Sequence, residues 1–324
     1  MSTNHVIPRN GKHRRFRRHI RSTYRSKVNA RRRFFKMDSR AVSNIVTSIM
    51  MLGIIFTLLG MVLTVYVPIW AKSLEAQHME EVANAFTDLK STVDSQIAQG
   101  DEGTTMSTRV RLGTEGGPLL GLGQSTGSLQ FQPESSMMSI YNSNDTFEKY
   151  GTGRGRLAFE SHNIYYVDQR YIYENGAIIL DQEGQTLMKV KPNFFINNVS
   201  GTNEFSTVMI GLQGDLDNVG GIKSQTVQTT LLSGNKNTLY WGESSRPGTG
   251  KNLTISINTS FPLVWNQYFD DLLKNQSGLN QSEYYIAAPS VIGDPIDNFW
   301  RIDVTIRDVN KFTTTISYVE LIIT

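Results

Sequence analysis

Cysteine is absent from the 324 residues of this chain, and histidine is scarce. Without thiols the chain cannot form a disulfide, a thiolate metal site or a cysteine nucleophile. Beyond the first forty residues only His78 and His162 occur, so a zinc site of several histidines is excluded and a Ser/His/Asp triad would have to use His162. We interpret His162 as a surface or hairpin residue. We predict that the chain is not an enzyme and holds no metal or cofactor.

Charged residues are also missing between Ala41 and Ala71. Within this stretch, residues 45–71 are almost all apolar. About 20 consecutive apolar residues span the hydrocarbon core of a bilayer, which is roughly 30 Å thick. The stretch therefore predicts a transmembrane helix. A buried core helix is the alternative, and it is disfavoured because core helices seldom run this long without a charge.

The charge differs in sign on the two sides of the apolar stretch. Residues 1–40 hold fourteen Lys and Arg and one acidic residue, Asp38, for a net charge of +13, whereas the rest of the chain carries −10. Lysine and arginine are enriched on the cytoplasmic side of membrane helices, and aromatic residues such as Tyr66 and Trp70 are common at the interface. We expect a single-pass protein with a cytoplasmic N-terminus and an extracellular C-terminal domain.

Apolar residues continue at helical spacing beyond the membrane stretch, at Leu74, Val82, Phe86, Leu89, Val93 and Ile97. We expect Glu75 and the other acidic residues of this segment to lie on other faces of the helix. Pro68 should kink the helix, and Gly100 should end it. The apolar stripe can pack on the globular domain that follows, and a simple stalk is the alternative.

The junction between the basic flank and the apolar helix, residues 39–46, reads SRAVSNIV. It resembles the class III signal peptide junction of archaeal type IV pilin-like proteins. The resemblance implies that a membrane aspartyl peptidase of the prepilin-peptidase kind cuts after Ala41. Arg40 would be the residue two before the cut, and Val42 would be the new N-terminus. A second segment, residues 171–179, is similar to part of archaeal pilin-like proteins.

This resemblance implies a pilin-like surface protein, structural or adhesive, that displays a β domain outside the cell. Its partners would be the lipid bilayer, the processing peptidase, and other pilin-like subunits or cell-envelope components. The alternative is a membrane-tethered envelope-binding protein or adhesin that does not polymerise. The two hypotheses differ in whether the leader is removed.

The basic arm contains two arginine-rich runs, residues 14–18 and 31–36. Such arms bind nucleic acid phosphates or anionic lipid head groups. Nothing else in the chain supports nucleic acid binding, so we predict no nucleic acid partner. Two interpretations stay open: the arm lies at the membrane surface, or translation starts at Met37, which gives a leader of normal length for this family.

The remainder of the chain predicts an α+β fold, in which the long helix precedes a mainly antiparallel, sandwich-like β domain. Asn175-Gly176 between two β-rich runs is a strong hairpin signal. One helix is expected at residues 262–274. The predicted organisation is a basic leader (1–41), the helix (42–98), a Gly/Ser/Thr-rich connection with short strands (99–135) and a β-rich domain (136–324).

The strands predicted from alternating or β-rich runs are 107–112, 128–132, 137–142, 156–160, 164–168, 170–174, 177–181, 186–190, 194–198, 205–212, 225–232, 238–241, 253–258, 284–288, 299–307 and 314–323.

Two patterns in the exposed domain bear on function. Residues 214–218 (GDLDN) resemble the start of an EF-hand calcium loop. The twelfth position of such a loop should be acidic, but here it is Thr226, so we predict a turn. Acceptor patterns for N-glycosylation occur at Asn144, Asn198, Asn252, Asn258, Asn275 and Asn280. Surface loops are better acceptors than buried strands.

Overall fold

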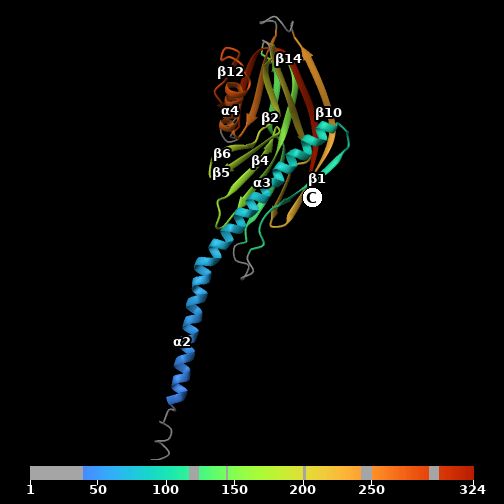
Figure 1. Cartoon of the computed structure of the whole chain (residues 1–324). Coiled ribbons are helices and arrows are strands. Elements are labelled where there is room, and N and C mark those ends of the chain that lie inside the picture. The colour runs from blue at the N-terminus through green and yellow to red at the C-terminus, as the bar shows by residue number, and fades with distance from the viewer. Residues whose placement is uncertain (1–38, 117–123, 144, 200–201, 242–249, 292–298) are drawn as a thin grey trace, which may run out of the picture. The chain divides into compact units, whose positions relative to one another are not determined.

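The computed structural model describes residues 39–116, 124–143, 145–199, 202–241, 250–291 and 299–324. The chain divides into two compact units, Met1–Val65 and Tyr66–Thr324, and each is described by itself. The first contains an apolar helix, and the second contains a mainly antiparallel β domain. The predicted α+β class is confirmed (Figure 1).

Helix α2, Ser39–Met61, is followed by a π-helical turn, η1, at Val62–Tyr66. The π-turn comes just before Pro68, which has no N–H to donate to the carbonyl of Thr64. The hydroxyls of Thr47, Ser48, Thr57 and Thr64 each donate to the carbonyl four residues back, at 2.8–2.9 Å. These polar side chains therefore need no partner from outside the helix, which suits an apolar surrounding.

Helix α3, Val67–Gln99, ends at Gly100, whose φ of 72° is the left-handed conformation common after helix ends. The predicted stop is confirmed. Val82, Phe86, Leu89 and Val93 are fully buried against strands of the sheet. The apolar stripe thus packs on the β domain, as one of the two interpretations expected. Figure 1 shows α3 crossing one face of the sheet.

In the described part of the chain, one sheet of fourteen strands makes up the β domain. The main order is β1-β10-β14-β11-β2-β3-β4-β5-β6, and β7, β8, β9, β12 and β13 pair off this path. Its strands are β1 (Thr105–Arg111), β2 (Thr126–Asn142), β3 (Asp145–His162), β4 (Gln169–Glu174), β5 (Ala177–Gln182), β6 (Gln185–Val190), β7 (Phe194–Val199), β8 (Thr202–Gln213), β9 (Asp217–Gly221), β10 (Ser224–Tyr240), β11 (Lys251–Thr259), β12 (Tyr284–Ile286), β13 (Ser290–Val291) and β14 (Trp300–Ile323).

Strand β14 organises the sheet because each of its halves has partners on both sides. Its first half pairs with β11 on one side and with β12 and β13 on the other. Its second half pairs with β10 antiparallel and with β8 parallel. The sheet curls so that β3 faces β8 closely. A Cβ on Gly153 of β3 would lie 2.7 Å from the carbonyl oxygen of Ile210, so only glycine allows this approach.

Two hydrophobic cores lie on opposite faces of the central strands. One gathers around α3, and the other gathers around α4 (Pro262–Asp271) with its π-helical extension η2 (Leu272–Gln276). Strand β4 separates them: Tyr173 belongs to the α3 core and Ile172 to the α4 core. The predicted helix at 262–274 is confirmed, and its apolar face fills the second core.

The strand predictions were mostly correct, with three differences. The predicted strand at 164–168 is wrong, because these residues form a bend between β3 and β4. Three pairs of predicted runs are each one strand: 128–132 and 137–142 belong to β2, 225–232 and 238–241 belong to β10, and 299–307 and 314–323 belong to β14. Strands β9 and β13 were not predicted. The hairpin turn is confirmed, since Asn175 and Gly176 have φ of 48° and 76°, as a type I′ turn requires.

Candidate functional site

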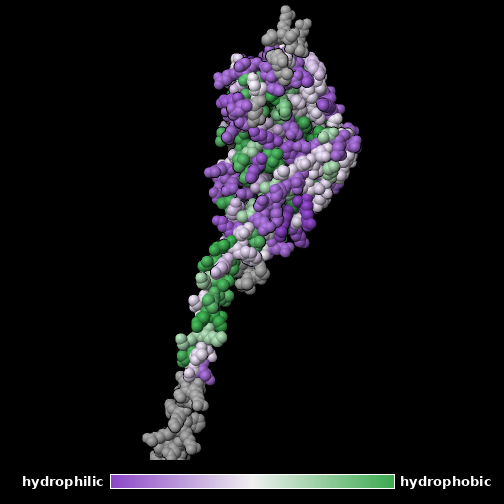
Figure 2. Space-filling model, viewed as in Figure 1, coloured by the Kyte–Doolittle hydropathy of each residue, from purple (hydrophilic) through white to green (hydrophobic). Residues whose placement is uncertain are grey.

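The predicted processing residues lie at the start of helix α2. Arg40, Ala41 and Val42 fall in its first turn, where the structure describes their backbone. From Ser43 to Leu59 every side chain of α2 is exposed, including Ile49 and Met50. Figure 2 shows apolar residues covering this segment, whereas the visible face of the β domain is largely hydrophilic. The helix is long and apolar enough to cross a membrane.

Helix α3 holds a fully buried carboxylate, Glu75, that sequence reasoning placed on the wrong face. Its oxygens accept the backbone N–H groups of Ile164 at 2.9 Å, Tyr165 at 2.8 Å and Tyr166 at 2.6 Å. Consecutive N–H groups that point to one centre form an anion-binding nest. Glu75 therefore fixes the β3–β4 bend onto the helix, and this is why residues 164–168 are not a strand.

Replacing Glu75 with alanine should release this bend. Three backbone N–H groups then lose a charged acceptor. Because the bend is partly exposed, water takes over part of the hydrogen bonding. We therefore expect the free energy of unfolding to fall by about 1–3 kcal/mol. Amide hydrogen exchange at residues 164–166 should become faster. Glu80→Ala, an exposed acid on the same helix, is the control and should leave exchange at the bend unchanged. Equal protection in both variants would contradict the clamp.

Further polar contacts tie α3 to the sheet along its length. His78 Nε2 lies 2.9 Å from the carbonyl oxygen of Arg111, and its ring meets Phe159 edge-on at 6.1 Å. Near the C-terminal end, Gln96 Nε2 donates to the carbonyls of Thr104 and Thr229, at 2.8 and 2.9 Å. These buried contacts fix the register of the helix, so α3 is part of the domain and not a free stalk.

A second buried carboxylate, Glu174, lies at the end of β4 in the α4 core. Its Oε1 accepts hydrogen bonds from Thr259 Oγ1 and from Trp265 Nε1, both at 2.7 Å. Burial raises the pKa of Glu174, and the donors and Arg156 oppose the shift only in part. Because Trp265 belongs to α4, the carboxylate anchors this helix to the sheet. In the sequence, the surrounding residues YENG indicated only a hairpin turn and gave no sign of a buried carboxylate.

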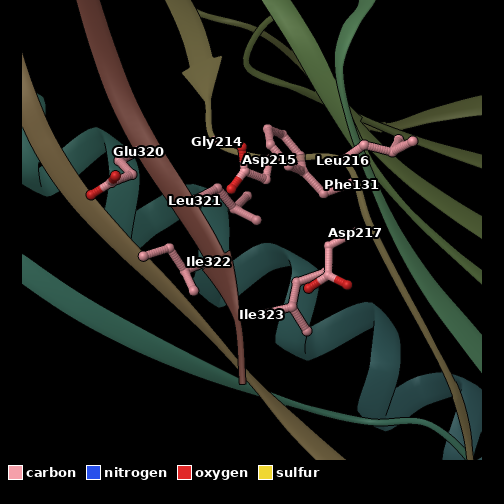
Figure 3. Close-up of a pocket in the computed structure, with 9 residues that line it drawn as sticks. All are labelled: Phe131, Gly214, Asp215, Leu216, Asp217, Glu320, Leu321, Ile322 and Ile323. Atoms are coloured by element: carbon pink, nitrogen blue, oxygen red, sulfur yellow. The ribbon is translucent and has the colours of Figure 1, made fainter.

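An open pocket of about 480 Å³ lies beside the predicted turn at 214–218. Asp215, Asp217 and Glu320 line it together with apolar residues. Figure 3 shows Asp217 and Glu320 on opposite sides of the pocket. In the described part of the chain no three acidic, histidine or cysteine groups come close enough to hold a metal ion. Residues 214–216 form the connection between β8 and β9, as predicted, but Asp217 and Asn218 are already part of β9.

The six glycosylation patterns lie in different settings. Asn144 is outside the described residues. The three in strands are engaged or partly buried: Asn198 Nδ2 donates to Asn203 at 2.7 Å, Asn252 Oδ1 accepts the Asp308 N–H at 3.1 Å, and Asn258 pairs within the sheet between Met137 and Arg301. Asn275 is exposed in η2, and Asn280 is exposed in the segment that follows η2. Of the described acceptors, these two are the accessible ones.

The histidine at the end of β3, His162, is exposed, as predicted. Within the described residues, two carboxylates, those of Glu75 and Glu174, are fully buried. Each is held by donors and fixes a structural element.

The fold and these features define a class of protein in which a β domain follows one helix that is apolar enough to cross a membrane. The chain belongs to the family described as a family of unknown function (DUF7289), which matches residues 40–291. No curated protein and no solved structure matches the chain.

Proposed function

We propose that this protein is a pilin-like cell-surface protein, cut at a class III signal peptide and anchored by α2, that displays its β domain outside the cell. The observation that carries the proposal is the apolar surface of α2, which is exposed on all sides. Such a helix needs lipid, or copies of itself, to cover it. The basic leader supports a cytoplasmic N-terminus by the positive-inside rule. The family match begins at Arg40, next to the proposed cut.

Mass spectrometry of the protein from its native membrane tests the cut. We expect a mature chain that begins at Val42, and we expect Ala41→Leu to abolish cleavage, because a bulky residue replaces a small one at the site. The uncut chain keeps its basic flank, and it should stay in the membrane fraction. Val46→Leu, a conservative change further along the helix, is the control and should be cut normally. A native protein that retains Arg40 would refute this mechanism.

A second experiment separates a fibre subunit from a tethered monomer. Gly53, Thr57, Gly60 and Thr64 share one face of the helix, and a Cβ on either glycine would meet nothing within 4 Å. Small residues allow close approach between apolar helices. Gly53→Leu with Gly60→Leu should therefore leave expression, cleavage and the β domain intact, yet abolish assembly, as measured by cross-linking and by electron microscopy of sheared surface material.

The control for that variant is Ser48→Leu, which adds similar bulk on the opposite face of α2 and should permit assembly. If the wild-type protein forms no multimers, or if the glycine replacements leave them unchanged, the non-polymerising adhesin or envelope-binding protein becomes the better description.

A further inference from the structure

One face of the sheet is left open beyond the end of α3. Helix α3 ends beside Leu231 of β10, where the Gly103 N–H donates to the Leu231 carbonyl at 2.7 Å. Strand β10 continues to Tyr240, paired throughout with β14. In Figure 1 both strands extend above α3. The face that α3 covers over Val319 and Leu321 continues along the other halves of the same strands, where none of the described helices covers it.

The sheet register assigns the side chains of this open face. Tyr240, Lys311, Glu204 and Asn197 form one row across β10, β14, β8 and β7. The next row consists of Thr238, Thr313, Ser206 and Phe195, and the third begins with Lys236, Thr315 and Val208. Residues in register across a sheet lie on the same side of it. We call this set the polar face.

Aromatic rings stand at both margins of the polar face. Phe195 on β7 is 74% exposed and Tyr240 on β10 is 71% exposed. Three strand spacings separate their strands, roughly 14 Å. Between them lie the hydroxyls of Thr238, Thr313 and Ser206. Large exposed apolar side chains that border a regular polar array mark an interaction site more than a random surface.

Charge on the polar face is largely balanced. Lys311 Nζ and Glu204 Oε2 form an ion pair at 3.1 Å. Lys236 has no ion-pair partner among the described residues. Over most of its area the face therefore offers hydroxyl and amide groups instead of a field of one sign. Such a surface complements an uncharged polar ligand better than a polyanion, which requires clustered Lys and Arg.

A pocket of about 420 Å³ lies where the polar face meets the end of α3. Gly234, Lys236 and Thr315 line it from the sheet, and Asp94 lines it from the helix. Asp94 is neutralised there, since Lys90 Nζ lies 2.6 Å from Oδ2 and Asn193 Nδ2 donates to Oδ1 at 3.1 Å.

The strand pairing places a buried hydroxyl next to this pocket. Ser317 pairs with Gly234, and its Oγ is fully buried and has no hydrogen-bond partner among the described residues. That oxygen lies 3.5 Å from the point where a Cβ of Gly234 would be. Gly234 lies over this hydroxyl without a side chain of its own, but the oxygen is inaccessible to solvent and does not itself line the pocket.

We propose that the polar face binds a neutral polysaccharide, with sugar rings stacked on Phe195 and Tyr240 and sugar hydroxyls bonded to the Ser and Thr rows and to the pocket. Sugars present an apolar ring face and a rim of hydroxyls, and this matches aromatic margins around a hydroxyl array. The inference goes beyond the proposed function and does not depend on whether the leader is cut or the helix polymerises.

The test uses the full chain in a detergent whose head group is not a sugar, so that the detergent does not compete. The probes are cellulose and chitin particles for neutral glycans and dextran sulfate beads for polyanions. We expect retention on cellulose or chitin that persists in 1 M NaCl, where the screening length is about 3 Å. Phe195→Ala and Tyr240→Ala should each weaken retention by about tenfold through loss of ring contact.

Three further variants make the result specific. Tyr240→Phe keeps the ring and should keep binding, whereas Thr315→Val keeps the strand shape, removes a hydroxyl and should weaken it. Tyr285→Ala removes a 57% exposed ring on β12, outside the polar face, and should have no effect. These side chains are exposed or half-buried, so thermal unfolding of every variant should match the wild type.

Four results would overturn the proposal. The first is no retention on cellulose or chitin, and the second is retention that survives both alanine replacements. The third is retention on dextran sulfate alone and only at low salt. The fourth is that replacing Phe195 or Tyr240 changes self-association but not glycan retention. The mass of the mature N-terminus is read separately, so failure here is distinct from failure of the processing mechanism.

Discussion

Replacing Phe86 with alanine is expected to lower the free energy of unfolding of the β domain by about 3–5 kcal/mol, the range for a large aromatic residue removed from a core. Phe86 is fully buried at the centre of the α3 stripe, and its ring lies 6.0 Å from that of Tyr171 on β4. The loss combines reduced apolar burial with the cavity left between helix and sheet. Denaturant unfolding of the full chain, followed by tryptophan fluorescence, measures it.

The control for Phe86 is Asn84→Ala, an exposed position two residues earlier on the same helix. It should change stability by less than about 0.5 kcal/mol. Amide exchange should show α3 losing protection in Phe86→Ala before the strands around α4 do, since the two helices serve different cores. A loss below about 1 kcal/mol would mean that α3 is a stalk with little share in the stability of the domain.

Replacing Glu174 tests the second core, and the expected effect depends on the substituent. Alanine leaves the Thr259 hydroxyl and the Trp265 indole N–H without their acceptor. With about 1–3 kcal/mol for each such buried donor, we expect a loss of about 2–6 kcal/mol in the free energy of unfolding. Glutamine keeps an acceptor oxygen and removes the buried charge. We expect Glu174→Gln to be close to the wild type at neutral pH, or more stable.

The pH dependence follows from the raised pKa of Glu174. In the folded state the group binds a proton at a higher pH than its ordinary value of 4.5, so between these two values the folded chain holds more protons than the unfolded one. The contribution of Glu174 to stability is therefore fully present below pH 4.5 and is lost as pH rises through the folded pKa. Glu174→Gln should remove this component, measured as the wild-type-minus-variant difference in unfolding free energy across pH. A difference that stays constant with pH would contradict the assignment.

Local sequence patterns were enough to predict the elements that depend least on contacts with distant parts of the chain. The α3 stripe, the second helix and the Asn175-Gly176 turn follow from helical spacing and turn chemistry, and all three are present. The run at 164–168 failed because its β-like composition competes with Glu75, a residue about ninety positions away that takes its N–H groups. Long-range contacts of this kind leave no local signal.

The division of β14 into two predicted strands has a similar cause. Polar residues around Asp308 look like a turn, but the chain continues through them with Asp308 at a φ of 53°. Its carboxylate accepts the Gly250 N–H at 2.6 Å, so the irregularity is absorbed as a bulge between β14 and β11. The polar face could not be predicted from the sequence for the same reason. Its rows combine residues of β7, β8, β10 and β14, which become neighbours only in the folded sheet.

Strand β14 also limits when the domain can complete its fold. It follows β8, β10 and β11 in the chain, pairs with all three, and contributes side chains to both cores. Neither core can close until residues 300–323 are available, and the closing contacts span about a hundred residues, which makes folding slow. If the domain crosses a membrane as an extended chain, the edges of β8, β10 and β11 stay unpaired until residues 300–323 arrive. The interval just before β14 emerges is therefore when this protein is most exposed to aggregation and proteolysis.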